Sequence, residues 1–156
     1  MIDVLYAEIN DELEEKVIEH FGSWIKEYQC IQKGCGCYAI AALHEGKIVG
    51  CAAIHPAQFI PPLEKYFDAF IEFIEVDESY RRQGIGRRMI GILEEKAREH
   101  GYKQIRAWSS QDKVEALKMW YSMNYCMCPA AMLGQSIAPG FENQQIIGYY
   151  YAKILN

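Results

Sequence analysis

The stretch that decides the fold is residues 71–90, which read IEFIEVDESYRRQGIGRRMI. Its first part continues an apolar run, FIEFIEV at 70–76, that predicts a β-strand. Gly84 and Gly86 follow between arginines, and a helical pattern begins at Ile85. The first turn of a helix carries free N–H groups and a partial positive charge, and glycine lets an anion approach the backbone. The segment is therefore either an anion cradle or a plain strand-to-helix corner.

Two common phosphate motifs do not match this segment. The dinucleotide fingerprint needs a third glycine where this chain has Met89, and the P-loop needs a Gly-Lys-Ser/Thr sequence that is absent. Positive charge is available in either interpretation, from Arg81, Arg82, Arg87 and Arg88. The residues alone leave the cradle and the corner open.

Length and composition bound the kind of protein. The chain has 156 residues, 51% of them hydrophobic, so we expect a single domain spanning 1–156 with a full core. The net charge of −5 makes nucleic acid a poor partner. No apolar run approaches the roughly 18 residues of a membrane span, and the N-terminus is acidic. We expect a cytoplasmic protein with no membrane partner, as a monomer or homodimer.

The six cysteines suggest packing more than metal binding. Two C-x-C pairs occur, whereas a four-thiolate metal site more typically shows C-x-x-C pairs. C-x-C in a strand places both thiols on one face, which suits small buried apolar groups. We expect no metal, and a thiolate site is the weaker alternative. The pairs are Cys35 with Cys37 and Cys126 with Cys128.

Periodicity along the chain predicts the order β-α-β-β-β-α-β-α-β-β. Helices interleave with strands, so the class is α/β (α+β), with a mixed, mostly antiparallel sheet of about seven strands flanked by helices. The expected strands are 3–8, 37–44, 47–55, 70–76, 103–108, 125–128 and 146–155. The expected helices run from Asn10 or Asp11 toward Gly34, from Ile85 to a stop at Gly101, and over 112–123; loops are expected at 55–69 and 129–145.

With the strand before it, the glycine segment resembles the acetyl-CoA signature of the GNAT superfamily of N-acetyltransferases. The R/Q-x-x-G-x-G/A core of that signature matches residues 81–86, RRQGIG. Ile74-Glu75-Val76 and Tyr80 stand before it, as in the family. The expected order of elements also matches, so the resemblance covers nearly the whole chain. It implies a single-domain GNAT-like fold and acetyl-CoA as cosubstrate, without a metal.

The resemblance also implies which residues hold the cosubstrate. Backbone amides of the glycine turn would hold the CoA pyrophosphate, and the pantetheine arm would pair with the strand before the turn, from Ile74 through Glu75 to Val76. A strand splayed from its neighbour leaves N–H and C=O groups that such an arm can satisfy. Lys113 stands where the family often has an asparagine and could reach a CoA phosphate. The turn positions are Arg81, Arg82, Gln83, Gly84, Ile85, Gly86 and Arg87.

Acyl transfer to an amine needs a base, because an ammonium cannot attack a thioester. Glu72 is the first candidate, since several family members carry a working glutamate there, and Glu75 is the second. The resemblance implies the backbone N–H of Ile74 or Glu75 as the oxyanion donor. Strict alternation places Glu72 on the face of Ile74 and Val76, with Glu75 opposite. A bulge, common beside active sites, would change that assignment.

The proton donor for the leaving thiolate is less defined. The family's tyrosine position is occupied by Trp120, whose indole N–H is not an acid at neutral pH. Tyr121 is adjacent but rotated by about 100° on a helix. Either Tyr121 serves, or the thiolate leaves without a protein acid. The four histidines show no pairing pattern in the sequence.

The acceptor is expected to be a primary amine of a small molecule, bound by the irregular segments. A protein N-terminus or lysine is an alternative acceptor, and a non-catalytic acyl-CoA-binding or sensor module is an alternative class, motivated by Trp120. An acyl-cysteine route through Cys126 or Cys128 is a minor possibility. Aromatic and acidic residues expected near the acceptor are Phe59, Tyr66, Phe67, Phe141, Glu64 and Asp68.

Overall fold

The computed structural model describes residues 2–58, 65–133 and 136–156. The helices are α1 (Asp11–Phe21), α2 (Trp24–Glu27), α3 (Ile85–Glu99) and α4 (Val114–Ser122), with a 3-10 turn at Glu78–Tyr80. The strands are β1 (Leu5–Glu8), β2 (Tyr38–His44), β3 (Lys47–Gln58), β4 (Phe67–Val76), β5 (Gln104–Ser110), β6 (Cys126–Leu133), β7 (Ser136–Pro139) and β8 (Gly148–Ile154).

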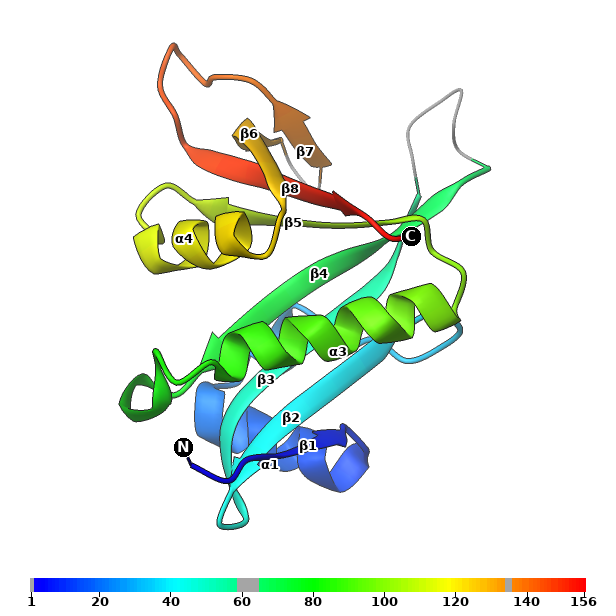
Figure 1. Cartoon of the computed structure of the whole chain (residues 1–156), viewed down its shortest axis with the longest axis vertical. Coiled ribbons are helices and arrows are strands. Elements are labelled where there is room, and N and C mark those ends of the chain that lie inside the picture. Colours follow the sequence, from blue (N-terminus) through cyan, green and yellow to red (C-terminus); the bar gives the residue numbers. More distant parts are fainter. Residues whose placement is uncertain (1, 59–64, 134–135) are drawn as a thin grey trace.

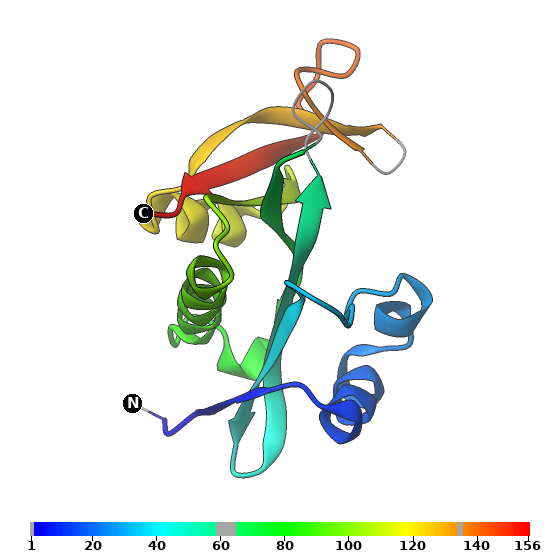
Figure 2. The same ribbon diagram turned by 90° about the vertical axis from the view of Figure 1, so that its right-hand side faces the viewer.

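The strands of the described residues form one sheet in the order β1-β2-β3-β4-β5-β8-β6-β7. All neighbouring strands are antiparallel except β4 and β5, which are parallel. Helices α3 and α4 cover one face, and α1 and α2 lie against the other (Figures 1 and 2). The prediction of a mixed, mostly antiparallel sheet flanked by helices is confirmed. The structure has one strand more than the seven expected, because β7 lies inside the segment predicted as a loop.

The N-terminal helix is shorter than its apolar stripe predicts. Asn10 caps α1 by accepting a hydrogen bond from the Leu13 N–H at 2.9 Å. The helix ends at Gly22, whose φ of +119° suits glycine, and α2 begins two residues later. A Cβ at Gly22 would lie 2.9 Å from the Trp24 ring. One glycine thus divides the predicted helix into two.

In the β2–β4 region one prediction is confirmed and two strand boundaries differ. The hairpin at Glu45-Gly46 is confirmed, with φ of +50° and +76°, as its turn type requires. Strand β3 then continues to Gln58, and β4 already begins at Phe67, so the predicted loop is largely strand. Both strands are long because they pair with each other along most of their length.

Two apolar clusters form the core, one on each face of the sheet. Met89, Ile90 and Leu93 of α3 pack on the first face, where each is fully buried. Val17 of α1 and Ile25 of α2 pack on the second face. The two faces of the same strands are therefore covered by different helices, α1 and α2 on one and α3 and α4 on the other.

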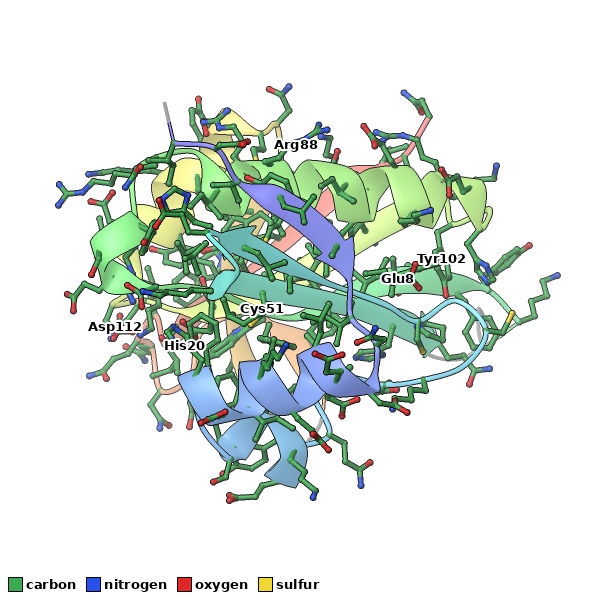
Figure 3. All side chains as sticks on the ribbon, turned by 90° about the horizontal axis from the view of Figure 1, so that it is seen from below. Glu8, His20, Cys51, Arg88, Tyr102 and Asp112 are labelled. Carbon is green, nitrogen blue, oxygen red and sulfur yellow. The ribbon has the colours of Figure 1, made fainter. Side chains whose placement is uncertain are left out.

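The buried thiols are not those of the C-x-C pairs. Cys30 and Cys51 are buried in the second cluster, and Cys51 lies between the sheet and α1 (Figure 3). Cys35 and Cys126 are exposed, so the expectation of buried C-x-C pairs is wrong. Residues 35–37 precede β2 and do not form a strand. Within the described residues, no group of three or more acidic, histidine or cysteine side chains could hold a metal.

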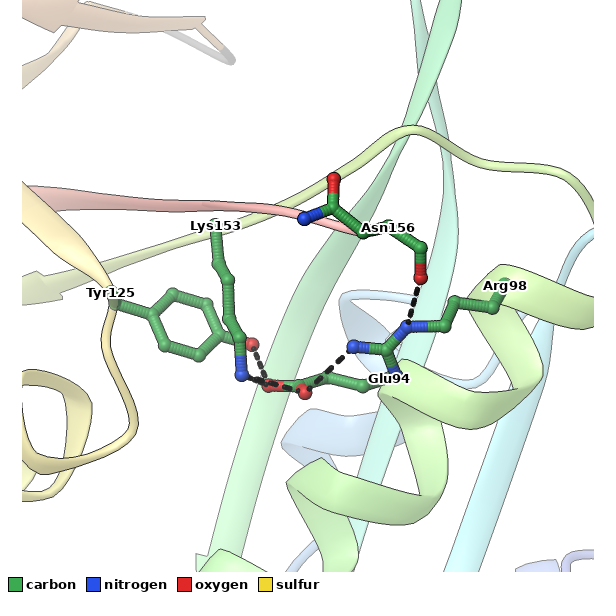
Figure 4. A network of polar contacts seen from close by, with 5 residues as sticks. All are labelled: Glu94, Arg98, Tyr125, Lys153 and Asn156. Atoms are coloured by element: carbon green, nitrogen blue, oxygen red, sulfur yellow. Dashed lines mark hydrogen bonds and ion pairs between the residues drawn. The ribbon is translucent and has the colours of Figure 1, made fainter.

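A buried polar network ties α3 to β8 and the segment before β6 (Figure 4). Glu94 is only 5% exposed. Its carboxylate accepts hydrogen bonds from Lys153 Nζ at 2.8 and 3.0 Å and from the Tyr125 hydroxyl at 2.9 Å. Arg98 Nη2 lies 3.7 Å away, while its Nε donates to the carbonyl oxygen of Asn156 at 3.2 Å. The network holds β8, the segment before β6 and the C-terminal residue to α3.

The helices show no membrane-crossing element. Among residues 2–58, 65–133 and 136–156, none of the helices is long and apolar enough to span a bilayer.

Candidate active site

The sheet opens between β4 and β5. These strands pair only at Ala69 with Ile105 and at Phe70 with Arg106. Beyond Phe70, β4 pairs with β3 on one side alone, in the part of the chain that the structure describes, while β5 continues along β8. The divergence of the two strands is visible in Figure 1. The β5-facing edge of residues 71–76 therefore offers backbone N–H and C=O groups to a ligand.

The glycine turn lies at the end of this open edge. Gly84 has φ of +84° and serves as the N-cap of α3, and Arg82 has φ of +61°. The first bond of the helix runs from the Arg88 N–H to the Gly84 carbonyl at 3.0 Å. Within the described residues, no backbone carbonyl accepts a hydrogen bond from the amides of 82–87. These free amides and the helix N-terminus fit a diphosphate.

Gly86 keeps this turn close to β4. A Cβ at Gly86 would lie 3.4 Å from Ile74 Cδ1, 3.5 Å from Met119 Sδ and 3.7 Å from Val76 Cγ2. These are ordinary contact distances. The glycine therefore leaves a gap about one methyl group wide between α3, α4 and the open edge.

Several polar side chains of the turn are already engaged with the protein. Arg81 Nε donates to the Val76 carbonyl at 3.1 Å, and Gln83 Nε2 donates to the Ser79 carbonyl at 3.4 Å. Arg87 Nη2 donates to the Ser122 hydroxyl at 2.7 Å, linking α3 to α4. These side chains brace the turn through contacts within the protein.

A β-bulge at Glu72 overturns the strict alternation expected for β4. Ala53 pairs with Phe73, but the next residue of β3, Ile54, pairs with Ile71, so Glu72 is the extra residue. Ile71 belongs to the α3–α4 cluster and Phe73 to the α1–α2 cluster. The expectation that Glu72 shares the face of Ile74 and Val76 is therefore wrong. The bulge places it on the opposite face.

Glu72 meets a histidine on that face. His55 Nε2 lies 2.9 Å from Glu72 Oε2, with 17% and 29% of the two side chains exposed. His55 Nδ1 lies 3.0 Å from the Pro56 carbonyl oxygen. Burial of the imidazole lowers its pKa, but the Glu72 hydrogen bond, the Pro56 carbonyl and the Glu72 charge raise it above its usual value. No pairing signal for His55 is present in the sequence, because the contact depends on the bulge in the β3–β4 register.

Glu75 lies on the same face as Glu72. It pairs across the strands with Cys51 of the α1–α2 cluster, and cross-strand partners share a face. Burial raises the pKa of the Glu75 carboxyl, and the charges of Arg81 and Lys113 partly offset that shift. The structure thus brings both candidate bases to one face, with Arg81 and Lys113 close to the second.

Neither Trp120 nor Tyr121, the two adjacent aromatic residues of α4, is placed as an evident proton donor. Trp120 is 2% exposed and packs against the rings of Tyr125 and Tyr151, with centroids 4.8 and 5.4 Å away. Tyr121 is 71% exposed. It follows Met119, which faces Gly86, by two residues, or about 200° around the helix. Tyr121 therefore points away from the glycine turn, which disfavours the expected acid role.

The expected acceptor residues are only partly where the sequence suggested. Asp68 is fully buried and lies 2.9 Å from Arg106 Nε, so it does not offer a free carboxylate. Burial raises the pKa of Asp68 to about 6, against the lowering effect of Arg106. Phe59 and Glu64 lie outside the described residues. Of the expected acceptor residues that the structure describes, the exposed aromatics are Tyr66, Phe67 and Phe141.

A mixed sheet that opens between β4 and β5, with a helix start of free amides at the opening, is the arrangement expected for an acyltransferase. The chain belongs to the acetyltransferase (GNAT) family, whose model matches residues 3–125. The predicted family and enzyme class are confirmed. No curated protein sequence matches the chain.

Solved structures share the fold at low sequence identity. A GNAT-family acetyltransferase from Streptococcus pneumoniae has a TM-score of 0.73 at 13% identity, covering 99% of this chain and 100% of its own. The ribosomal-protein-S18-alanine N-acetyltransferase of Escherichia coli gives 0.71 at 14%, covering 99% and 95%. Arabidopsis thaliana NAA60 in complex with acetyl-CoA gives 0.69 at 13%, covering 99% of each chain. These similarities confirm the fold over almost the whole chain.

Proposed function

We propose that the protein transfers an acetyl group from acetyl-CoA to the primary amine of a small molecule, by direct attack in a ternary complex. The observation that carries this proposal is the position of Glu72 and Glu75. Both carboxylates lie on the α1–α2 face, beside the open edge of β4. The free amides of the glycine turn lie at the end of the same edge. A donor held by the turn and an acceptor held by the carboxylates would meet there.

The residues of the glycine turn fit the diphosphate of acetyl-CoA, which would supply an activated thioester. The amides of 82–87 would hold that diphosphate. The backbone of Ile74, Glu75 and Val76 would pair with the amide-bearing arm, and the N–H of Ile74 or Glu75 would face the thioester oxygen. Lys113 lies near Glu75 and adds positive charge on that side of the opening.

The acceptor ammonium must lose two protons overall. A carboxylate of the site takes the first, directly or through water, and leaves a neutral amine. The amine nitrogen then bonds to the thioester carbonyl carbon as the carbon–sulfur bond breaks. The second proton leaves the nitrogen and ends on the departing sulfur. Glu72 is the first candidate for the base and Glu75 the second; Tyr121 remains a weaker candidate for the acid because of its exposure.

Two alternatives have specific support. The similarity to the ribosomal-protein-S18-alanine N-acetyltransferase favours a protein N-terminus as acceptor, and a lysine side chain is chemically equivalent. The burial of Trp120 at the family's tyrosine position favours a binding module that has lost catalysis. The second alternative predicts CoA binding without turnover.

An amine panel with acetyl-CoA separates these functions. The panel contains spermidine, an aminoglycoside, free amino acids and peptides with a free N-terminus or an internal lysine, and free thiol is followed over time. Turnover with a small amine and not with the peptides is expected. Faster turnover with peptides would reassign the acceptor. Tight CoA binding by calorimetry with no turnover on any amine would favour the binding module.

A further inference from the structure

We propose that His55 and Glu72 act as one proton acceptor, in which the imidazole sets the pH at which the acceptor ammonium is deprotonated. This inference rests on the proposed function. It adds His55 of β3 to the reacting groups, as the partner through which Glu72 acts.

The hydrogen-bond geometry assigns a shared proton to this pair. His55 Nδ1 faces the Pro56 carbonyl oxygen at 3.0 Å, and a carbonyl only accepts, so Nδ1 carries a hydrogen. His55 Nε2 faces Glu72 Oε2 at 2.9 Å, which also requires a hydrogen between them. The pair is therefore either imidazolium with carboxylate or imidazole with carboxylic acid. In both forms it holds one proton more than the form that can act as a base.

The surroundings of the pair keep this proton exchangeable. Arg106 of β5 lies close enough to His55 for its charge to oppose protonation of the imidazole. That guanidinium is itself paired with the buried carboxylate of Asp68 at 2.9 Å. Cys30, in the segment after α2, is close enough to Glu72 to sense its charge, and burial with that charge raises its pKa to about 11, so it stays a neutral thiol.

Packing fixes the imidazole from one side and leaves the carboxylate accessible. The His55 ring lies against Phe70, with centroids 5.5 Å apart, and Phe70 also contacts the Arg106 guanidinium. Glu72 keeps 29% of its side chain exposed. Its Oε1 accepts no hydrogen bond within the described residues. An ammonium can therefore reach the carboxylate while His55 stays in place.

The chemistry explains why an imidazole partner helps. An isolated carboxylate, with a pKa of about 4.3, is a weak base toward an ammonium with a pKa near 10. Once the shared proton has left, the pair carries one negative charge. A proton taken from the ammonium by Glu72 then passes to Nε2, where it is held more strongly than by a carboxylate. The proton later leaves to water, and the pair returns to its starting form.

A comparison of His55→Gln with His20→Gln tests the proposal. His20 Nε2 also faces a carboxylate, Asp77 Oδ2 at 3.1 Å, but at the far end of β4, so this variant is a matched control. The pH profile of kcat/KM is measured with the fastest amine of the panel. In wild type and in His20→Gln, kcat/KM should fall as the pH is lowered, and the midpoint of this acidic limb should lie above pH of about 6.5. His55→Gln should move that limb by more than about one unit toward acid, and lower the plateau by about tenfold or more.

A second measurement keeps the test open if His55→Gln fails to fold. The Cε1–H signal of His55 is titrated by NMR in wild type and in Glu72→Gln. In wild type its midpoint should match the kinetic limb, and in Glu72→Gln it should move to lower pH. The dyad would be overturned if His55→Gln leaves the acidic limb of the kcat/KM profile in place. It would also be overturned if the NMR midpoint of His55 in the active wild-type enzyme differs from the midpoint of that limb. Absence of turnover by wild type would instead overturn the proposed function and the dyad's role with it.

Discussion

Two carboxylates in this protein pair with basic side chains of neighbouring elements, and their surroundings differ. Glu94 is 5% exposed and receives hydrogen bonds from a lysine and a tyrosine, with an arginine 3.7 Å away. Glu72 has 29% of its side chain exposed and pairs with one imidazole. A saturated buried carboxylate holds elements together, because each of its partners is costly to remove. An open one, with a titratable partner, can exchange a proton with a substrate.

The largest expected effect is on stability, from breaking the Glu94 network. Lys153→Met removes the cation closest to the buried carboxylate and should lower the free energy of unfolding by about 3 kcal/mol. Urea denaturation measures this. The catalytic rate of the protein that remains folded should change little, because the network lies away from the glycine turn.

The matched control is Lys118→Met. Lys118 lies 3.4 Å from Glu115, with 70% and 76% of the side chains exposed, so its loss should change stability by less than about 0.5 kcal/mol. Equal destabilisation by the two substitutions would mean that burial does not distinguish the Glu94 network from a surface pair.

The second effect is on catalysis, at the open carboxylate. Glu72→Gln removes the proton acceptor while keeping the shape, so kcat should fall about 100-fold or more with CoA affinity unchanged. Glu75→Gln, three residues along the same strand and on the same face, is the comparison variant. Its kcat should fall less. A larger loss in Glu75→Gln would transfer the role of base to Glu75.

The third effect is on CoA binding, and it compares two glycines of α3, one beside the open edge of β4 and one away from it. A Cβ at Gly86 meets Ile74, Val76 and Met119 at contact distances, which would narrow the proposed path beside β4. Gly86→Ala should raise the Kd for CoA about tenfold, while the unfolding free energy changes by less than about 1 kcal/mol. Calorimetry and urea denaturation provide the two numbers.

Gly91→Ala is the control in the same helix. A Cβ there meets no atom within 4 Å, so it should stabilise the protein by up to about 1 kcal/mol and leave the Kd unchanged. An equal rise of Kd in both variants would indicate that helix rigidity, not the gap at Gly86, limits CoA binding.

Much of the fold could be predicted because its signals are local. The four-residue repeat of α3 and its stop at Gly101 follow from neighbouring residues, and the structure has α3 at Ile85–Glu99. The glycine turn was also recognisable, because a strand, two glycines and a helix start occur within 71–90. The break at Gly22 was missed, because a helical apolar stripe continues across it and only the backbone φ reveals it.

The partners of the site could not be predicted because they depend on register. The Glu72–His55 contact joins residues 17 apart, and it exists only where the β3–β4 pairing skips Glu72. The Glu94–Lys153 contact joins residues 59 apart, through strands whose order in the sheet is not their order in the chain. Alternation alone assigns the wrong face to a residue at a bulge. A single extra residue therefore decides that Glu72 lies on the same face of the sheet as Glu75.

The smallest effect, in the pH dependence of stability, distinguishes the two carboxylates without a substrate. The folded-state pKa of His55 is raised above its usual value by Glu72 and the Pro56 carbonyl, despite burial. The folded protein therefore holds this proton more tightly than the unfolded chain. The resulting stabilisation is fully present below pH of about 6.5 and is lost as pH rises through the folded-state value.

The difference in unfolding free energy between wild type and His55→Gln should therefore shrink as pH rises from about 6 to about 8. Subtracting the variant removes the contribution of the other histidines, which both proteins share. Lys153→Met should keep the pH slope of wild type, because the Glu94 network contains no imidazole. A constant difference between wild type and His55→Gln would mean that the imidazole does not hold its proton through Glu72. The pair would then be a structural brace of the bulge, equivalent in kind to the Glu94 network.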